Sequence, residues 1–462
     1  MLFSTPLFLF VFLPLAIVFY NAVPASWRNS AILTISVAFY AWGEPRFVFV
    51  VLASALLDYA LGRHIARDGG WTQACLVIGI ANNLGLLFVF KYADFALRTA
   101  QPFLGPMPHL GLILPLGISF VVFEKITYLV DIHRKTGRPA ASLWDYLVFV
   151  FLFPKMLAGP IIKYREIAPA LLERPNTMDD FVLGFRRFIW GLAKKVLVAD
   201  VCGEVADAVF ALPLSALGCA TAWAGVLAFT VQIYLDFSGY SDMAIGIARM
   251  FGFRLRENFD HPYGAASFTE FWRRWHMSLT TWIRDYLYIP LGGNRHGPVR
   301  TYINLWICFL LSGLWHGANW TFVCWGAYNG AILIADRLFW LRFVDRLPRP
   351  VSIGVNLLLV MAGWTLFRAA DFAQARAVLQ AMASPALTGQ FVWIQPYQIA
   401  AIAVGLGGSL LAATGFGRAT AARVEAAPLG RLGAAIGVVA VGGFALSKAI
   451  AVTFNPFLYF RF

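Results

Sequence analysis

The chain has 462 residues, of which 60% are hydrophobic and only 13% are charged, and its formal net charge is +13. Soluble domains carry about 25% charged residues, so this composition excludes an ordinary soluble protein and indicates a membrane protein. The basic balance is explained by Lys and Arg in cytoplasmic loops beside anionic lipid headgroups, and nucleic acid is not expected as a partner. The five cysteines lack metal-ligand spacing and are interpreted as small core residues, so no metal site is expected.

Apolar stretches close to the ~20 residues that span a bilayer recur along the chain. They are continuous rather than alternating, which predicts helices and not a β-barrel. We therefore predict an all-α polytopic bundle of about 11–13 membrane segments, several of them short or re-entrant. In chain order the candidate segments are 5–23, 30–42, 46–62, 72–92, 110–131, 143–162, 180–201, 221–248, 302–315, 318–338, 350–368, 395–413 and 432–453. No cleavable signal peptide is expected, because the apolar start has no basic region before it.

Polar residues concentrate in the segment 110–330, whereas 1–109 and 331–462 are mainly plain membrane helices. Glu124 and Lys125 are neighbours in an apolar helix and point about 100° apart, so we expect their partners on other helices. Two prolines and a glycine within 153–164 predict a hinge or re-entrant segment, whose backbone must be buried or line a cavity.

The segment 232–242 carries two rows of polar residues at helical spacing, one made of Gln232, Asp236 and Tyr240 and the other of Tyr234, Ser238 and Asp242. The rows lie about 200° apart, so the helix is polar on opposite faces. Such a helix cannot face lipid on either side. We predict that it lies in the protein interior and supports a polar site or a water-filled cavity.

The segment 271–286 has the pattern of an interfacial amphipathic helix, with aromatic residues on one face. Its other face carries Arg273, His276, Thr280 and Arg284. A flexible basic loop follows at 287–295, and Arg binds phosphate by charge-assisted hydrogen bonds. The candidate donor-binding residues are Arg273, Arg274, Arg284 and Arg295, although membrane topology alone also places cations in loops.

His316 follows the apolar run 305–311, where the membrane makes an ionisable side chain costly. Such a residue usually faces a cavity and has a function, because burial in lipid costs a few kcal/mol or more. The alternative is a packing histidine that is hydrogen-bonded between helices.

Taken in order, these segments resemble the membrane-bound O-acyltransferase superfamily, and in particular its bacterial branch that acetylates exported polysaccharides such as alginate. The likeness is carried by Trp-Arg-Arg-Trp-His-Met-Ser-Leu at 272–279 and Leu-Trp-His-Gly-Ala-Asn-Trp at 314–320, with support from 114–120, 153–166, 232–246 and 455–460. It spans almost the whole chain and implies one integral-membrane acyltransferase domain over 1–462, built around a central funnel or tunnel. Lys155 departs from the family pattern, which favours Gln.

The resemblance implies that His316 is catalytic and that His276 is a second essential or supporting group, which orients the donor or stabilises the thioester oxygen. A neutral imidazole suits His316 as a general base or as a transient acyl acceptor, and both roles remain open. The predicted supporting residues are Trp315, Asn319, Asp236 and Tyr240. No bound cofactor is expected, and the donor is expected to be acetyl-CoA or another cytosolic acyl thioester.

The expected acceptor is a hydroxyl of an exopolysaccharide, and the expected location is the bacterial inner membrane, in contact with lipid. No large soluble domain is available to hold a polymer, so a separate periplasmic acetyltransferase or esterase-like partner is expected. Two other classes compete with the enzyme, namely a transporter or channel and a non-catalytic scaffold of a polysaccharide-modification complex. Within the enzyme class, acylation of peptidoglycan, cellulose or teichoic acid is the alternative.

Overall fold

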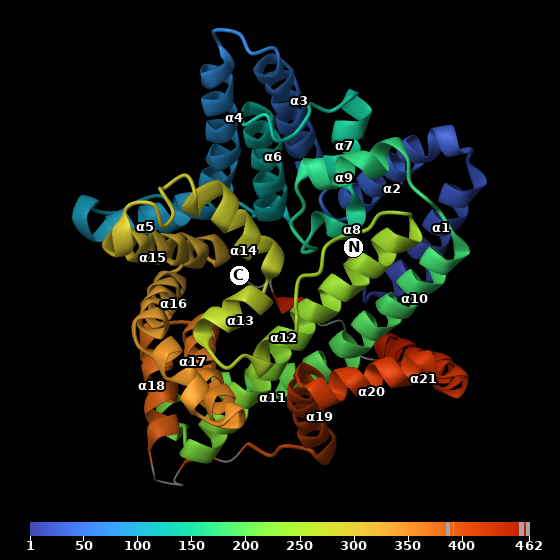
Figure 1. Ribbon diagram of the computed structural model, residues 1–462. Helices are drawn as coiled ribbons and strands as arrows, with labels where there is room; N and C mark the ends of the chain where they lie inside the picture. Colours follow the sequence, from blue (N-terminus) through green and yellow to red (C-terminus); the bar gives the residue numbers. More distant parts are fainter. Residues whose placement is uncertain (385–388, 391, 452–456, 459–462) are drawn as a thin grey trace. The chain divides into compact units, whose positions relative to one another are not determined.

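The computed structural model describes residues 1–462 except 385–388, 391, 452–456 and 459–462. The described residues form helices and loops without a strand, which confirms the all-α prediction (Figure 1). Six helical segments among them are long and apolar enough to cross a membrane: Phe47–Ala66, Thr72–Leu104, Cys219–Met250, Arg349–Arg368, Pro396–Ala413 and Pro428–Ala451. Other predicted segments coincide with shorter or less apolar helices. Of the terminal motif at 455–460, only Phe457 and Leu458 lie among the described residues.

The chain divides into two compact units. Unit 1 comprises Met1–Phe188 and Ser241–Arg256, and unit 2 comprises Ile189–Tyr240 and Glu257–Phe462. Two helices, α10 (Met178–Ala193) and α12 (Cys219–Met250), contribute residues to both units. The polar segment 110–330 is likewise shared between them.

Unit 1 is built from short and medium helices. They are α1 (Leu13–Ala22), α2 (Arg28–Gly43), α3 (Phe47–Ala66), α4 (Thr72–Leu87), α5 (Ala93–Leu104), α6 (Ile118–His133), α7 (Leu143–Phe151), α8 (Phe153–Met156) and α9 (Tyr164–Leu172). Helices α3, α4 and α6 pack against one another and lie side by side in Figure 1.

The adjacent charges on α6 find partners on different helices, as the sequence predicts. Lys125 lies 3.1 Å from the carboxylate of Asp58 on α3 and also donates to Ser54. Glu124 forms an ion pair with Lys155 on α8. All four charged side chains are at most 2% exposed, so each charge is neutralised inside the protein. Lys155, which departs from the family pattern, supplies the counter-charge that Glu124 requires.

The predicted break near 153–164 is confirmed. Helix α8 has only four residues, and the chain is not α-helical again until α9 begins at Tyr164. The backbone N–H of Ile162 donates to Glu124 at 3.2 Å, so the same carboxylate holds both ends of the irregular segment. All residues from 153 to 164 are buried, which is the condition for non-helical backbone in a membrane protein.

Unit 2 contains the remaining helices. They are α11 (Asp200–Phe210), α13 (Phe268–Arg274), α14 (Met277–Ile283), α15 (Gly297–His316), α16 (Trp320–Leu338), α17 (Arg349–Arg368), α18 (Phe372–Ala383), α19 (Pro396–Ala413), α20 (Gly415–Ala426) and α21 (Pro428–Ala451). Helices α15 and α16 pack closely at Gly313 and Gly326, because a Cβ on Gly313 would lie 3.0 Å from the Cα of Gly326. Small residues allow this approach, as is common between membrane helices.

Helix α12 has the buried character that its two polar faces predict, since 78% of its most apolar stretch is buried. Within unit 2, Asp236 forms an ion pair with Lys195 at 2.9 Å and accepts a hydrogen bond from the backbone of Leu458 at 2.7 Å. Tyr240 stacks on Phe457 with ring centroids 4.8 Å apart. These polar residues therefore hold Phe457 and Leu458 against α12.

Candidate functional site

The stretch 271–286 is not one amphipathic helix, so that interpretation of the sequence is wrong. Helix α13 ends at Arg274, and α14 begins at Met277. Between them His276 adopts a left-handed conformation with φ +44° and ψ +52°, which is uncommon for a residue other than glycine. The backbone of Asn258 accepts from Met277 at 2.9 Å, and the Asp260 N–H donates to Arg274 at 3.0 Å. These bonds from a distant segment fix the break, because they satisfy backbone groups on both sides of it.

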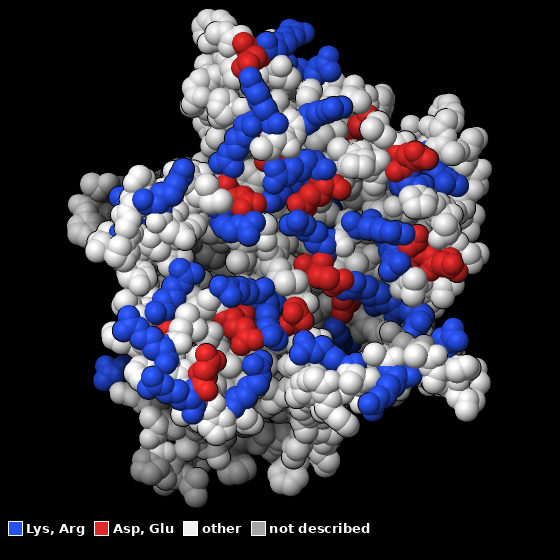
Figure 2. Space-filling model, in the orientation of Figure 1, with Lys and Arg blue, Asp and Glu red and all other residues white. Residues whose placement is uncertain are grey.

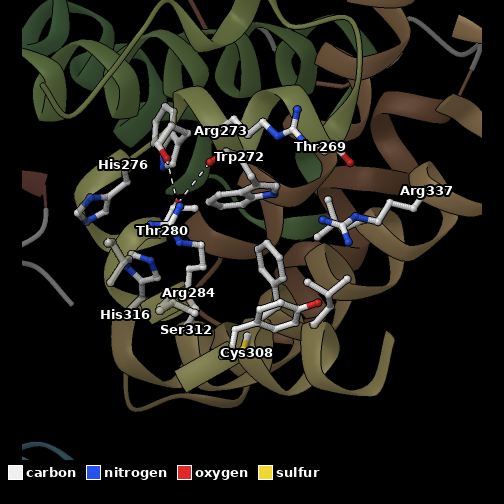
Figure 3. A pocket seen from close by; sticks show the side chains of 17 residues that line it. Thr269, Trp272, Arg273, His276, Thr280, Arg284, Cys308, Ser312, His316 and Arg337 are labelled. Atoms are coloured by element: carbon white, nitrogen blue, oxygen red, sulfur yellow. Dashed lines mark hydrogen bonds between the residues drawn. The ribbon is translucent and has the colours of Figure 1, made fainter. Parts of the chain in front are cut away.

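The break shapes a cavity of about 300 Å³ inside unit 2 (Figure 3). Its walls are mostly apolar, with a few polar and basic groups, as in a typical small-molecule site. Helix α15 contributes Cys308, Ser312 and His316, which follow one another at intervals of four residues and so share one face. The lining residues are Thr269, Trp272, Arg273, Trp275, His276, Leu279, Thr280, Ile283, Arg284, Tyr288, Leu305, Cys308, Phe309, Ser312, His316, Leu333 and Arg337.

Both predicted catalytic histidines line this cavity and lie at the same end of it (Figure 3). His316 is the last residue of α15 and is 6% exposed, and His276 is 1% exposed. The Trp315 ring lies near both, with its centroid 6.3 Å from His276 and 5.0 Å from His316. The structure therefore brings together two histidines that stand forty residues apart in the sequence.

Aromatic rings surround the imidazole of His316. Its centroid lies 5.2 Å from Trp325 and 5.4 Å from Phe367, and the planes are close to perpendicular in both pairs. Such edge-to-face contacts fix a ring in orientation as well as position. The imidazole is thus held by packing between α15, α16 and α17.

His276 is held differently, by one hydrogen bond and one ring. Its Nδ1 lies 3.1 Å from Oδ1 of Asn258, and its ring meets Phe237 edge-on at 4.6 Å. Burial lowers the pKa of His276 to about 3, because the charged imidazolium would lose its hydration. The ring is therefore neutral at physiological pH, as a proton acceptor must be.

Three arginines line the cavity, two of them predicted donor-binding residues. Arg273 and Arg284 are exposed at the surface, and Arg284 also pairs with Asp285 at 2.8 Å. Arg337 on α16 lies at the end opposite the histidines (Figure 3). Sequence reasoning missed Arg337, although an arginine within the apolar segment 318–338 was a usable signal.

The other two predicted donor-binding residues do not line the cavity. Arg274 pairs with Glu270 at 2.5 Å, four residues earlier on α13. Arg295 donates to the backbone oxygens of Gly292 and Ile289 and so shapes its own loop. On the face shown in Figure 2, basic side chains gather over α13 and over the loop between α16 and α17, where Arg342 and Arg346 are exposed.

The predicted supporting residues divide into one beside the histidines and three elsewhere. Trp315 contacts both imidazoles, as described above. Asn319 caps α16 by accepting from the Thr321 N–H at 3.2 Å, and it is exposed. Asp236 and Tyr240 on α12 contact Leu458 and Phe457 and are not among the lining residues.

The sequence profile of the membrane-bound O-acyltransferase family matches residues 120–360, which include the whole cavity. The chain belongs to this family. It is 44% identical over 392 residues to a protein of Azotobacter vinelandii named "probable alginate O-acetylase", an alignment that covers 83% of this chain and 78% of the relative. A peptidoglycan O-acetyltransferase of Helicobacter pylori is 34% identical over 420 residues, covering 83% and 80%. A teichoic acid D-alanyltransferase of Bacillus subtilis is 25% identical over 295 residues, covering 59% and 74%.

Family membership and the apolar helices together make this chain a multi-pass membrane O-acyltransferase. The enzyme interpretation therefore stands, and the transporter and scaffold interpretations are set aside. The two histidine motifs on which the resemblance rests fall inside the matched region, and the structure places both histidines in one cavity.

Proposed function

We propose that this chain is an inner-membrane O-acetyltransferase that moves an acetyl group from a cytosolic thioester, such as acetyl-CoA, toward hydroxyls of an exported polysaccharide such as alginate. The convergence of His276 and His316 at one end of a cavity lined by arginines carries the proposal. The relatives named for alginate and peptidoglycan O-acetylation support a polysaccharide acceptor. Alginate is favoured because that relative is the more similar of the two.

The proposed reaction takes place at the histidine end of the cavity. The hydroxyl oxygen of the acceptor attacks the thioester carbonyl carbon, and the hydroxyl proton passes to an imidazole nitrogen of the histidine pair. The carbon–sulfur bond then breaks, and the imidazolium returns the proton to the leaving thiolate. The products are an ester and a free thiol, and the histidine ends in its original neutral form.

The arginines suit the phosphate groups of a thioester carrier. Arg337 lies at the far end from the histidines, whereas Arg284 lies beside them (Figure 3). In an acyl carrier the phosphates are distant from the thioester, so the carrier would lie along the cavity with its acyl group at the histidines. Guanidinium groups bind phosphate through paired charge-assisted hydrogen bonds.

A periplasmic acetyltransferase or esterase-like partner is part of the proposal. The described helices of unit 2 are joined by short connections, such as 339–348 between α16 and α17. Such connections are too short to hold a long polymer, so a separate partner would present the acceptor or pass the acetyl group to it.

The test is the loss of acetyl transfer in His316→Ala. Loss of a side chain that takes part in general acid–base catalysis costs about 10²–10⁴-fold in rate, and loss of His316 from the pair should cost as much. Transfer from labelled acetyl-CoA to isolated polysaccharide is measured in membranes, with the exposed His64→Ala as the matched control. Expression and co-purification of partners should be unchanged. If the His316→Ala variant acetylated the polymer about as fast as the unaltered protein does, the catalytic assignment of His316 would be refuted.

A further inference from the structure

One buried amide, Asn258, contacts both His276 and the start of α14. It is 1% exposed, and its Oδ1 accepts from the Ser278 N–H at 3.2 Å and from the Ser278 hydroxyl at 2.9 Å. The same atom lies 3.1 Å from Nδ1 of His276. Its main-chain oxygen accepts from Met277 at 2.9 Å, so both oxygens of Asn258 bind the residues that follow the break.

These contacts settle which nitrogen of His276 carries the hydrogen. The backbone N–H of Ser278 can only donate, so the side-chain atom of Asn258 that faces it is the carbonyl oxygen. An amide oxygen can only accept, so Nδ1 of His276 is the donor in their contact. In a neutral imidazole the other nitrogen, Nε2, is then unprotonated and presents a lone pair.

No described residue donates a hydrogen bond to Nε2. Among the residues that the structure describes, Nε2 of His276 is buried and has no hydrogen-bond partner. The side chain lines the cavity, at the end that it shares with His316. Buried polar atoms are nearly always paired, so an acceptor left open beside a cavity indicates a hydrogen-bond donor on the ligand.

We propose that Asn258 is a positioning residue that fixes His276 as the Nδ1–H tautomer, so that Nε2 of His276 receives the proton of the acceptor hydroxyl. The inference rests on the proposed function and names the member of the histidine pair that acts on the nucleophile. In this tautomer Nε2 has no hydrogen to give to the thioester oxygen. His276 therefore acts on the hydroxyl and does not stabilise the carbonyl.

The direct test is nitrogen-15 NMR of the full chain in lipid bilayers, with labelled histidine. The chemical shift of each imidazole nitrogen reports whether it carries a hydrogen. The signals of His276 are those that disappear in His276→Ala. At neutral pH the expected result is a protonated Nδ1 and an unprotonated Nε2. The opposite tautomer, or an imidazolium, would overturn the proposal whatever the activity.

The second test compares two replacements of Asn258. Asn258→Leu has a similar shape but accepts no hydrogen bond, so kcat should fall by about 10²–10⁴-fold, as when a general base is lost. Asn258→Asp keeps an acceptor oxygen and should restore kcat above that of the Leu variant. The matched control is Asn356→Ala, which removes another buried amide (3% exposed) that does not line the cavity.

The Asp variant also moves the pH profile in a defined direction. A carboxylate on Nδ1–H raises the pKa of His276, so the acid limb of kcat should move to higher pH. The other titratable or charged groups around the cavity are His316 and Cys308 on α15, Arg273, Arg284 and Tyr288 from the 268–288 stretch, and Arg337 on α16. From α12 the ring of Phe237 faces His276 and carries no charge. A purely structural role for Asn258 would lower activity without moving the profile.

The outcomes separate the two proposals. Equal loss in Asn258→Leu and Asn258→Asp, with an unmoved pH profile, would overturn the tautomer role while leaving the acetyltransferase intact. Near-normal transfer in His276→Ala would instead remove His276 from the proposed reaction. If the Asn258→Leu variant fails to fold, the pH profile of Asn258→Asp and the NMR result on the unmodified chain still test whether Asn258 fixes the tautomer of His276.

Discussion

Replacement of Lys125 by Met should destabilise unit 1 strongly. Lys125 and Asp58 are 1% and 0% exposed, and their charged atoms lie 3.1 Å apart. Without the ammonium group, Asp58 keeps a hydrogen bond from Asn83 at 2.8 Å but has no counter-charge. Removing one partner of a buried ion pair costs about 3–5 kcal/mol, because the remaining charge is buried and uncompensated. Folded proteins are stable by only about 5–15 kcal/mol, so this loss should be plain in a melting curve.

Thermal unfolding of the purified chain in detergent measures this effect. The double variant Asp58→Leu with Lys125→Met removes both charges and should recover most of the lost stability. The matched control is Lys135→Met, the same substitution in an ion pair with Asp68 whose side chains are 74% and 62% exposed. Equal melting temperatures for Lys125→Met and Lys135→Met would refute the reasoning, as would a double variant no more stable than Lys125→Met.

Three further predictions concern unit 2. Arg337→Gln should raise KM for acetyl-CoA with little change in kcat, because it removes an interaction that binds the ground state and the transition state equally. The control Arg342→Gln, at an exposed position, should leave KM unchanged. An unchanged KM for Arg337→Gln in steady-state kinetics would contradict a donor-binding role. Gly326→Val should lower the free energy of unfolding by about 1–3 kcal/mol by forcing α15 and α16 apart. An unchanged melting temperature would show that the two helices accommodate the larger side chain. Phe367→Leu removes one edge-to-face contact of His316, worth about 0.5–1.5 kcal/mol. It should lower kcat and leave KM nearly unchanged. A change in KM alone would show that the Phe367 ring does not orient the imidazole.

Much of the candidate site could be predicted from the sequence because its signals are local. His316 stands out as an ionisable residue after an apolar run, a signal that needs no knowledge of distant contacts, and it lines the cavity. His276, Arg273 and Arg284 follow from a short motif with regular spacing, and all three line the cavity. The adjacency of Glu124 and Lys125 predicts that their partners lie on other helices, but the partners themselves depend on the fold.

The break at His276 could not be predicted, because its cause is not local. The aromatic and polar pattern continues through 271–286 as though one helix carried it. The hydrogen bonds that end α13 and start α14 come from Asp260, 14 residues before Arg274, and from Asn258, 19 residues before Met277. Tertiary contacts thus override the local helical pattern, and residues of both predicted faces line the cavity.

Polar residues buried in this chain fall into two physical classes, those bound by partners within the protein and those that line the cavity. Asp236, one of the predicted supporting residues, is bound through its carboxylate by Lys195 and by the backbone N–H of Leu458. The same holds for Lys125, which binds Asp58 and Ser54. Burial alone does not separate such residues from His276, since all three are buried and all are costly to bury. What separates them is position, because His276 lines a cavity large enough for a substrate, and its Nε2 has no hydrogen-bond partner among the described residues.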